Sequence, residues 1–202
     1  MIRTQPYRGG WLEVVCGPMF SGKSEELIRR LRRAEIAGQR ALIVKPVVDD
    51  RYDVGHVVSH AGARMRAVTA SSSAEVARLT AGYDPVGFDE VQFFDDGIVA
   101  AIEALVARGA RVVAAGLAQD FRCQPFGAMP TLLSVAEFVD KLEAVCHRCG
   151  GPATLTQRLL DGRPAPLDGE IVQIGALDSY EARCRACHSV SQQALAACDI
   201  AS

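Results

Sequence analysis

Residues 17–24 read Gly-Pro-Met-Phe-Ser-Gly-Lys-Ser, and this short stretch decides which fold the chain can build. It fits the pattern G-x-x-x-x-G-K-[ST], whose glycines let the backbone curl until successive N–H groups point at phosphate oxygens. An apolar run at 12–16 precedes it, and an amphipathic helical pattern at 24–37 follows it. Strand, loop and helix in this order predict a nucleotide-phosphate site and disfavour an ordinary glycine-rich turn.

Within this loop, Lys23 is expected to bring a mobile positive charge to the β and γ phosphates, and the Ser24 hydroxyl is expected to bind Mg²⁺. The helix that begins here presents its positive end to the same anion. The loop therefore predicts nucleoside-triphosphate chemistry, but it does not identify the acceptor of the phosphate. The predicted phosphate-binding residues are Gly17, Pro18, Met19, Phe20, Ser21, Gly22, Lys23 and Ser24.

Apolar runs and helical patterns alternate along the first 145 residues. This alternation predicts right-handed βαβ units and an α/β fold with a mostly parallel sheet. After about residue 144, glycine, proline and short polar runs dominate, so we expect a nucleotide-binding domain at 1–145 and a small second domain at 146–202. Further strands are predicted at 41–44, 86–89, 111–115 and 135–139, further helices at 72–79 and 97–108, and a long loop at 46–63.

Two acidic residues, Asp89 and Glu90, end one of these predicted strands. Ligands of α/β sheets bind at the carboxyl ends of the strands, so Asp89 is expected to bind Mg²⁺ directly or through water. Glu90 is expected to face the γ-phosphate and to accept a proton from the attacking nucleophile. Without the phosphate loop the pair would more simply begin a loop. With the loop, a catalytic role is favoured, although the nucleophile can be water or a substrate hydroxyl.

Four of the seven cysteines form two identical pairs, Cys146-x-x-Cys149 and Cys184-x-x-Cys187. Two such pairs can complete a tetrahedral site of four sulfurs, which suits a structural Zn²⁺ better than a catalytic one. The 34 residues between the pairs exceed the roughly 15–20 that a minimal zinc ribbon needs. The surplus is either a loop that folds over a ligand or a decorative insertion, and both interpretations stay open here.

Composition narrows the choice of function. The 202 residues carry 22 basic and 24 acidic side chains, and 49% of them are apolar. High apolar content with small net charge excludes global disorder. Because the acidic side chains cancel the basic ones, the chain has no overall positive charge that would favour binding to nucleic acid. The sequence has no run of 18 apolar residues, so no membrane span is predicted. The first residues do not resemble a signal peptide, and a cytoplasmic protein is therefore expected.

The motifs, taken together and in order, resemble the type II thymidine kinases over about residues 10–190. This resemblance implies a RecA-like α/β domain with a zinc-containing lasso domain. It implies transfer of the ATP γ-phosphate to the 5′-hydroxyl of thymidine or deoxyuridine, with Mg²⁺ bound to ATP. It also implies a homotetramer and feedback inhibition by dTTP. The segments that carry it are 17–24, Lys45-Pro46, 49–52, Asp89-Glu90-Val91-Gln92-Phe93-Phe94, 116–121, 125–127, Ile174-Gly175, Tyr180 and the two cysteine pairs.

The resemblance also implies roles for single residues. Glu90 matches the general base, and the ATP site takes in Asp89, Val91, Gln92 and, near the transferred phosphate, Arg51. The implied thymidine-binding residues are Met19, Phe94, Leu117, Phe121, Phe126, Val172, Gln173, Ile174, Gly175, Ala176 and Tyr180. Two positions depart from the family pattern, because Ala118 replaces a usual Asp and Cys123 a usual Gly.

A P-loop ATPase with a DNA-binding zinc ribbon is the alternative from another class. A ribbon that binds DNA should be basic. Residues 146–190 instead mix arginines with acidic residues such as Asp161, Asp168 and Glu181, which favours the kinase. A third alternative, a nucleotide-binding protein without catalysis, is disfavoured because Lys23, Ser24, Asp89 and Glu90 are all retained.

Overall fold

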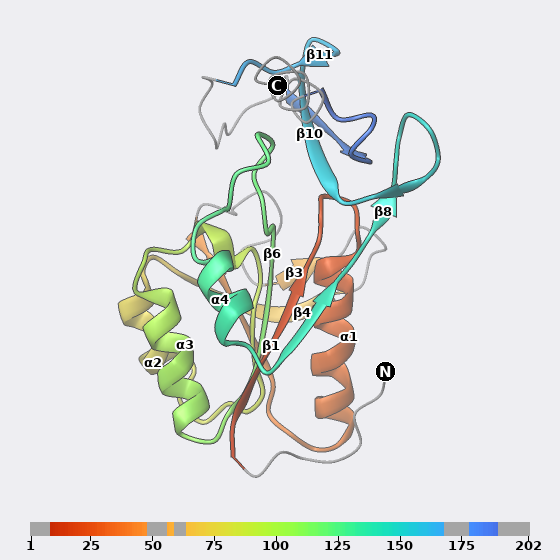
Figure 1. Cartoon of the computed structure of the whole chain (residues 1–202). Helices are drawn as coiled ribbons and strands as arrows, with labels where there is room; N and C mark the ends of the chain where they lie inside the picture. The colour runs from red at the N-terminus through yellow and green to blue at the C-terminus, as the bar shows by residue number, and fades with distance from the viewer. Residues whose placement is uncertain (1–8, 48–55, 59–63, 168–177, 190–202) are drawn as a thin grey trace.

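The computed structural model of the chain describes residues 9–47, 56–58, 64–167 and 178–189 (Figure 1). Its large sheet has seven strands in the order β3-β4-β2-β5-β6-β1-β7, and every neighbouring pair except β3 with β4 is parallel. The mostly parallel α/β fold predicted from the sequence is thereby confirmed. The strands are β1 (Trp11–Cys16), β2 (Leu42–Pro46), β3 (His56–Val58), β4 (Arg64–Ala70), β5 (Val86–Phe88), β6 (Arg111–Gly116) and β7 (Phe138–Lys141).

Helices cover both faces of this sheet. One face packs on α1, and the other on α2, α3 and α4, as the two sides of the ribbon in Figure 1 show. The helices are α1 (Lys23–Ile36), α2 (Val76–Leu79), α3 (Ile98–Ala107) and α4 (Met129–Val135), with 3₁₀ turns η2 (Ser73–Glu75) and η3 (Val91–Phe93). Among the described residues, none of these helices has the length and apolarity that crossing a membrane would require.

The burial of the central strand β1 explains why residues 12–16 form an apolar run. Leu12 and Val14 enter the core shared with α3 and α4, whereas Val15 enters the core shared with α1. A strand that is buried on both faces has no polar alternation, in contrast to a strand with one wet face. On α1, the predicted apolar stripe is confirmed, because Leu27 and Leu31 are fully buried.

Some predicted boundaries were wrong. The strand expected at 135–139 begins only at Phe138, because residues 129–135 form α4. As an edge strand paired with β1 alone, β7 leaves Val139 44% exposed and alternates inward and outward residues, so its apolar run is short. The loop expected at 46–63 contains the short strand β3.

The chain after β7 forms two small antiparallel sheets. One pairs β8 (Ala144–Val145) with β9 (Pro152–Ala153), and the other has the order β11-β10-β12. The strands of this three-stranded sheet are β10 (Leu155–Leu160), β11 (Arg163–Pro164) and β12 (Asp178–Arg183). Figure 1 shows these sheets beyond the end of the large sheet at which β1 runs into the phosphate loop. They therefore lie over the edge where α/β sheets bind ligands.

Candidate active site

The phosphate loop connects β1 to α1 and depends on glycine at two positions. Gly22 has a φ of +83°, a left-handed backbone that glycine adopts without strain, immediately before α1 begins. A Cβ added to Gly17 would lie 2.6 Å from the Ser21 hydroxyl and 2.7 Å from the Leu142 carbonyl oxygen. The loop thus packs tightly against its own turn and against the chain that leaves β7.

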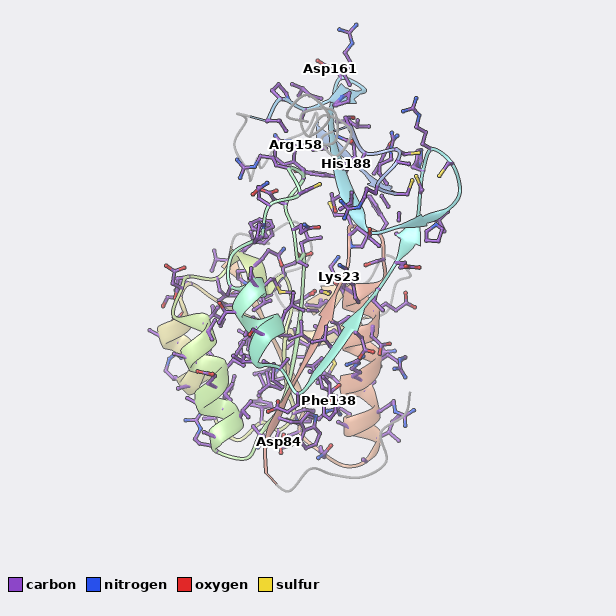
Figure 2. The ribbon with its side chains drawn as sticks, in the orientation of Figure 1. Lys23, Asp84, Phe138, Arg158, Asp161 and His188 are labelled. Atoms are coloured by element: carbon purple, nitrogen blue, oxygen red, sulfur yellow. The ribbon has the colours of Figure 1, made fainter. Side chains whose placement is uncertain are left out.

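Lys23 is held inside this loop. Its side chain is 8% exposed, and Nζ donates to the Pro18 carbonyl oxygen at 2.8 Å. Burial lowers the pKa of Lys23, and the negative charges of Glu90 and Asp89 oppose that effect. Figure 2 shows Lys23 at the end of the large sheet that faces the small sheets. The cation is therefore placed at the mouth of the loop beside two acidic groups.

Ser24 and Asp89 are 65 residues apart in sequence and meet at this site. The Ser24 hydroxyl donates to Asp89 Oδ1 at 3.1 Å, and the Asp89 side chain is only 4% exposed. The Asp89 N–H binds the Val44 carbonyl oxygen of β2, which fixes the residue at the carboxyl end of β5. The pair predicted to hold Mg²⁺ is thus brought together, with a hydroxyl and a carboxylate oxygen as hard ligands.

Glu90 follows directly and adopts a left-handed backbone with a φ of 48°. Gln92 Nε2 donates to Glu90 Oε2 at 2.5 Å, and Gln92 Oε1 accepts the Leu117 N–H at 3.0 Å. A Cβ on Gly116 would lie 2.5 Å from the same Oε1, so glycine is needed for this close approach. Gln92 is 3% exposed and joins the ends of β5 and β6, a bridging role that no local sequence pattern indicated.

The segment after β6 presents aromatic residues to the same edge. Phe121 is 4% exposed, and the guanidinium carbons of Arg158 and Arg122 lie over its ring, 5.3 Å and 5.8 Å from the ring centroid. Asp120 accepts from the Arg122 and Gln124 N–H groups at 2.9 Å each, which closes the turn. This turn gives Phe121 a fixed place beside the strand β10.

Cys123 and Ala118, the two departures from the family pattern, are both in this segment. Cys123 has a φ of 62°, in the left-handed region that glycine adopts more easily, so the glycine that the resemblance implies at this position would fit the backbone without strain. Ala118 accepts the Phe126 N–H through its carbonyl oxygen at 3.2 Å. A small hollow also includes Ala118 in its lining. The residues around it are Gly17, Pro18, Ala118, Gln119, Lys141, Thr154, Leu155 and Thr156.

Phe93 and Phe94 take different environments. Phe94 is 8% exposed and packs edge-on against Phe88 in the core, with ring centroids 6.1 Å apart. Phe93 packs edge-on against Phe126 at 5.3 Å. Phe126 therefore contacts Phe93 and not Phe94, although Phe94 is the one of these two that the sequence assigns to the thymidine site.

The other predicted ligand residues are placed unevenly. Tyr180 lies on β12, where it pairs with Arg158 of β10 and is half-buried. The Met19 N–H donates to the Thr156 hydroxyl at 3.0 Å, which joins the phosphate loop to β10. Several predicted residues lie outside the described part of the chain. These are Arg51, Val172, Gln173, Ile174, Gly175 and Ala176.

The four paired cysteines gather at the base of the small sheets. Their Sγ atoms all lie within 4.8 Å of one another, and Cys149 and Cys184 are 3.7 Å apart. A tetrahedral Zn²⁺ with bonds of about 2.3 Å separates its sulfur ligands by about 3.8 Å, so the spacing fits this metal. The four residues are Cys146, Cys149, Cys184 and Cys187.

The proton affinities of these thiols agree with a cation site. Burial opposes ionisation of Cys146, but N–H groups of the two turns, including those of Cys184 and Cys149, lower its pKa to about 6. Hydrogen bonding to Cys184, together with burial, raises the pKa of Cys187 to about 12. Four crowded sulfurs cannot all be anionic alone, and a divalent cation removes this conflict. The cluster can therefore bind a structural zinc.

A phosphate loop whose lysine and serine face an Asp-Glu pair at the end of a parallel strand defines a class, the P-loop enzymes that act on nucleoside triphosphates. Comparison with known families makes the assignment narrower. The family model described as thymidine kinase matches residues 10–188, and the chain belongs to the thymidine kinase family. It is therefore a phosphotransferase, and its family implies ATP and thymidine as substrates.

Proposed function

We propose that the protein transfers the γ-phosphate of ATP to the 5′-hydroxyl of thymidine or deoxyuridine, yielding ADP and, from thymidine, dTMP for nucleotide salvage. The observation that carries the proposal is the contact between Ser24 and Asp89, 3.1 Å long, beside Glu90 and the buried Lys23. These groups are the ones that phosphoryl transfer needs at one place, namely a metal-binding pair, a cation and a base.

The phosphate loop would bind the triphosphate. Loop N–H groups would point at its oxygens, and Lys23 would exchange the Pro18 carbonyl for the β and γ phosphates. Ser24 and Asp89 would hold Mg²⁺, which neutralises charge on the transferred phosphate. We further propose Val91, Gln92 and Arg51 as ATP-site residues, as the family resemblance implies.

Glu90 is the proposed general base. It would take the proton of the thymidine 5′-hydroxyl while the hydroxyl oxygen bonds to the γ-phosphorus. The bond from that phosphorus to the bridging oxygen of ADP breaks in the same transfer, and ADP leaves. The hydrogen bond from Gln92 orients the Glu90 carboxylate, and it leaves Oε1 of Glu90 for the substrate.

The thymidine pocket is proposed between the phosphate loop, the segment 117–126 and the lasso. Phe94 is proposed as one of its lining residues, as the family resemblance implies, and its contact with Phe88 would hold its ring in place. Residues 172–176 would read the thymine edge through backbone groups, with Tyr180 near the sugar. Cytosine has an amino donor where thymine has O4, so a mismatched buried group would cost about 1–3 kcal/mol. The other proposed lining residues are Met19, Leu117, Phe121 and Phe126.

The zinc-binding cysteines are proposed to hold residues 146–202 as a lasso domain, separate from the nucleotide-binding domain at 1–145. A metal that ties both ends of the segment 150–183 would hold its base while its middle closes on the nucleoside. We also propose a cytoplasmic homotetramer that dTTP inhibits by occupying the thymidine site. Membership of the thymidine kinase family supports these proposals, and we propose neither a nucleic acid nor a membrane as a partner.

A phosphoryl-transfer assay with ATP tests this function. Thymidine and deoxyuridine should give their monophosphates, whereas deoxycytidine and dTMP should give little product. Hydrolysis of ATP without any nucleotide product would contradict the proposal and favour a P-loop ATPase. A DNA-binding measurement on the same preparation would then test the ribbon alternative directly.

A further inference from the structure

His188 is a fully buried polar side chain that the proposed mechanism does not use. It is 0% exposed and directly follows Cys187, the last of the paired cysteines. His147 also directly follows a cysteine of the cluster, Cys146, although it lies inside the first pair, and 72% of its side chain is exposed. Two histidines that each follow a cysteine of the cluster therefore have opposite environments, and the burial of His188 calls for a physical reason.

The His188 ring joins three segments that are distant in sequence. Nε2 lies 3.1 Å from the Thr156 carbonyl oxygen, and since a carbonyl oxygen can only accept, Nε2 carries a proton and donates. Nδ1 lies 3.7 Å from the Cys123 Sγ, and the Phe121 backbone also hydrogen-bonds the ring. The ring thus connects the second cysteine turn, the strand β10 and the turn that carries Phe121. Figure 2 labels Arg158, which lies on β10, and His188, which lies in the segment that follows β12.

Two of these segments continue directly into the active site. The Thr156 hydroxyl accepts the Met19 N–H of the phosphate loop at 3.0 Å, from the same residue whose carbonyl binds His188. The Phe121 ring is stacked by Arg158, two residues further along β10. A shift of β10 would therefore move a backbone partner of the phosphate loop and the aromatic wall together.

A second contact strengthens the same connection. Gln157 is 1% exposed, and its Oε1 accepts the Ser189 N–H at 3.0 Å, one residue after His188. Neither histidine nitrogen points into the sulfur cluster, because one faces Thr156 and the other lies near Cys123. His188 is thus placed to transmit the position of the cysteine cluster and not to extend its ligand set.

We propose that His188 is a positioning residue, through which the zinc-binding turn fixes β10, the phosphate loop and the Phe121 turn in their relative places. The proposal rests on the proposed thymidine kinase function for its kinetic readout. Loss of the ring would leave the buried Thr156 carbonyl without this donor and release β10 from the turn at Cys187. Zinc would stay bound, since all four sulfurs remain.

The test compares His188→Leu, His188→Gln and His188→Asn. His188→Leu should retain about one zinc per chain, measured by elemental analysis, as a site of four thiolates predicts. Its thymidine KM should rise roughly 10-fold or more, as loss of a buried hydrogen bond implies, with a smaller change in kcat. His188→Gln can place an amide nitrogen where Nε2 was and should restore most of the affinity. The shorter His188→Asn reaches only the Nδ1 position and should not.

His147→Leu is the control, because it makes the same substitution directly after another cysteine of the cluster, inside the first pair, on an exposed side chain. It should leave zinc content and thymidine KM unchanged. Loss of zinc from His188→Leu, or a thymidine KM within twofold of the unmodified protein, would overturn the proposal.

If His188→Leu does not fold, equal KM values for the Gln and Asn variants would overturn the proposal instead. Calorimetry of the unmodified protein with thymidine tests the proposed function separately. If that function is wrong, the unmodified protein does not bind thymidine, whereas a failure of the His188 proposal leaves this binding intact.

Discussion

Glu90 is the residue on which the proposed chemistry depends most. Its backbone is left-handed and its carboxylate is held by Gln92, an arrangement that points one oxygen in a defined direction. We predict that Glu90→Gln keeps ATP binding but lowers kcat at least 100-fold, because the amide cannot accept the hydroxyl proton. Steady-state kinetics and nucleotide binding measure the two effects separately.

The control for this substitution is Glu103→Gln, which changes an exposed glutamate of α3 in the same way. Its kcat should equal that of the unmodified protein. Turnover near the normal rate in Glu90→Gln would assign the base to another group, and a loss of ATP binding would point to a structural role for Glu90.

At the scale of residues, the sequence predicted a contact where a motif fixes the position of both residues in the fold. Ser24 and Asp89 were expected to meet because both end or begin elements at one edge of a parallel sheet, and they lie 3.1 Å apart. Gln92 and His188 were not recognised as bridges, because their partners are set by tertiary packing. No spacing in the chain indicates that His188 will face Thr156.

Among the elements, the two cysteine turns make the clearest prediction. Cys184→Ser should lose zinc and thymidine affinity together, because the turn at 184–188 carries both the cluster and His188. Metal analysis and calorimetric thymidine binding measure both losses. Cys198→Ser, which leaves both cysteine pairs intact, is the control, and it should keep about one zinc per chain. Metal content that stays near that value in Cys184→Ser would show that the ligand set is wrong.

Elements with long, regular apolar patterns were predicted well, and the others were not. β1 and β6 are largely apolar runs because a core covers each of their two faces, and α1 has a regular apolar stripe because one core covers one side of it. β4 was missed, although it has seven residues, because its exposed Arg64 and Arg66 alternate with buried residues and leave no continuous apolar run. α4 was missed because it is only seven residues long and contains Pro130. Short elements bury too little surface for their period to be read.

For the whole molecule, the arrangement of the two parts was harder to predict than either part. The phosphate loop fixes the ligand edge of the large sheet, and the cysteine pairs predict a small metal-tethered unit. That the unit lies over this edge follows from contacts such as Met19 with Thr156, which only the folded chain reveals. The domain boundary near residue 145 remains a prediction, although the two small sheets begin at Ala144.

A network of charges ties the large sheet together and should govern its acid stability. Arg30 of α1 binds Glu13 of β1 at 2.7 Å, Glu26 of α1 at 2.8 Å and Asp140 of β7 at 2.8 Å. Burial opposes ionisation of Glu13, but hydrogen bonds from Arg111 and Trp11 and the arginine charges lower its pKa overall. The hydrogen bond from Arg29 is the main cause that lowers the pKa of Glu26 to about 2. Both carboxylates therefore favour the folded state when ionised.

The sign of the pH dependence follows from these shifts. The contribution of Glu26 is fully present above its ordinary pKa of 4.5 and is lost as the pH falls toward 2. Because the pairs with Arg29 and Arg30 are partly exposed, we expect Glu26→Gln to lower the free energy of unfolding by about 1 kcal/mol at pH 7. This difference should be mostly lost near pH 2, where the carboxylate is protonated in the unfolded state and about half protonated in the folded state.

Urea titrations of the two proteins from pH 7 to pH 2 measure the difference. Acid also protonates the thiols of the cysteine cluster, and that loss is common to both proteins, so it cancels when the two are subtracted. A difference that stays constant across this range would mean that Glu26 acts through packing of its methylene groups and not through its charge.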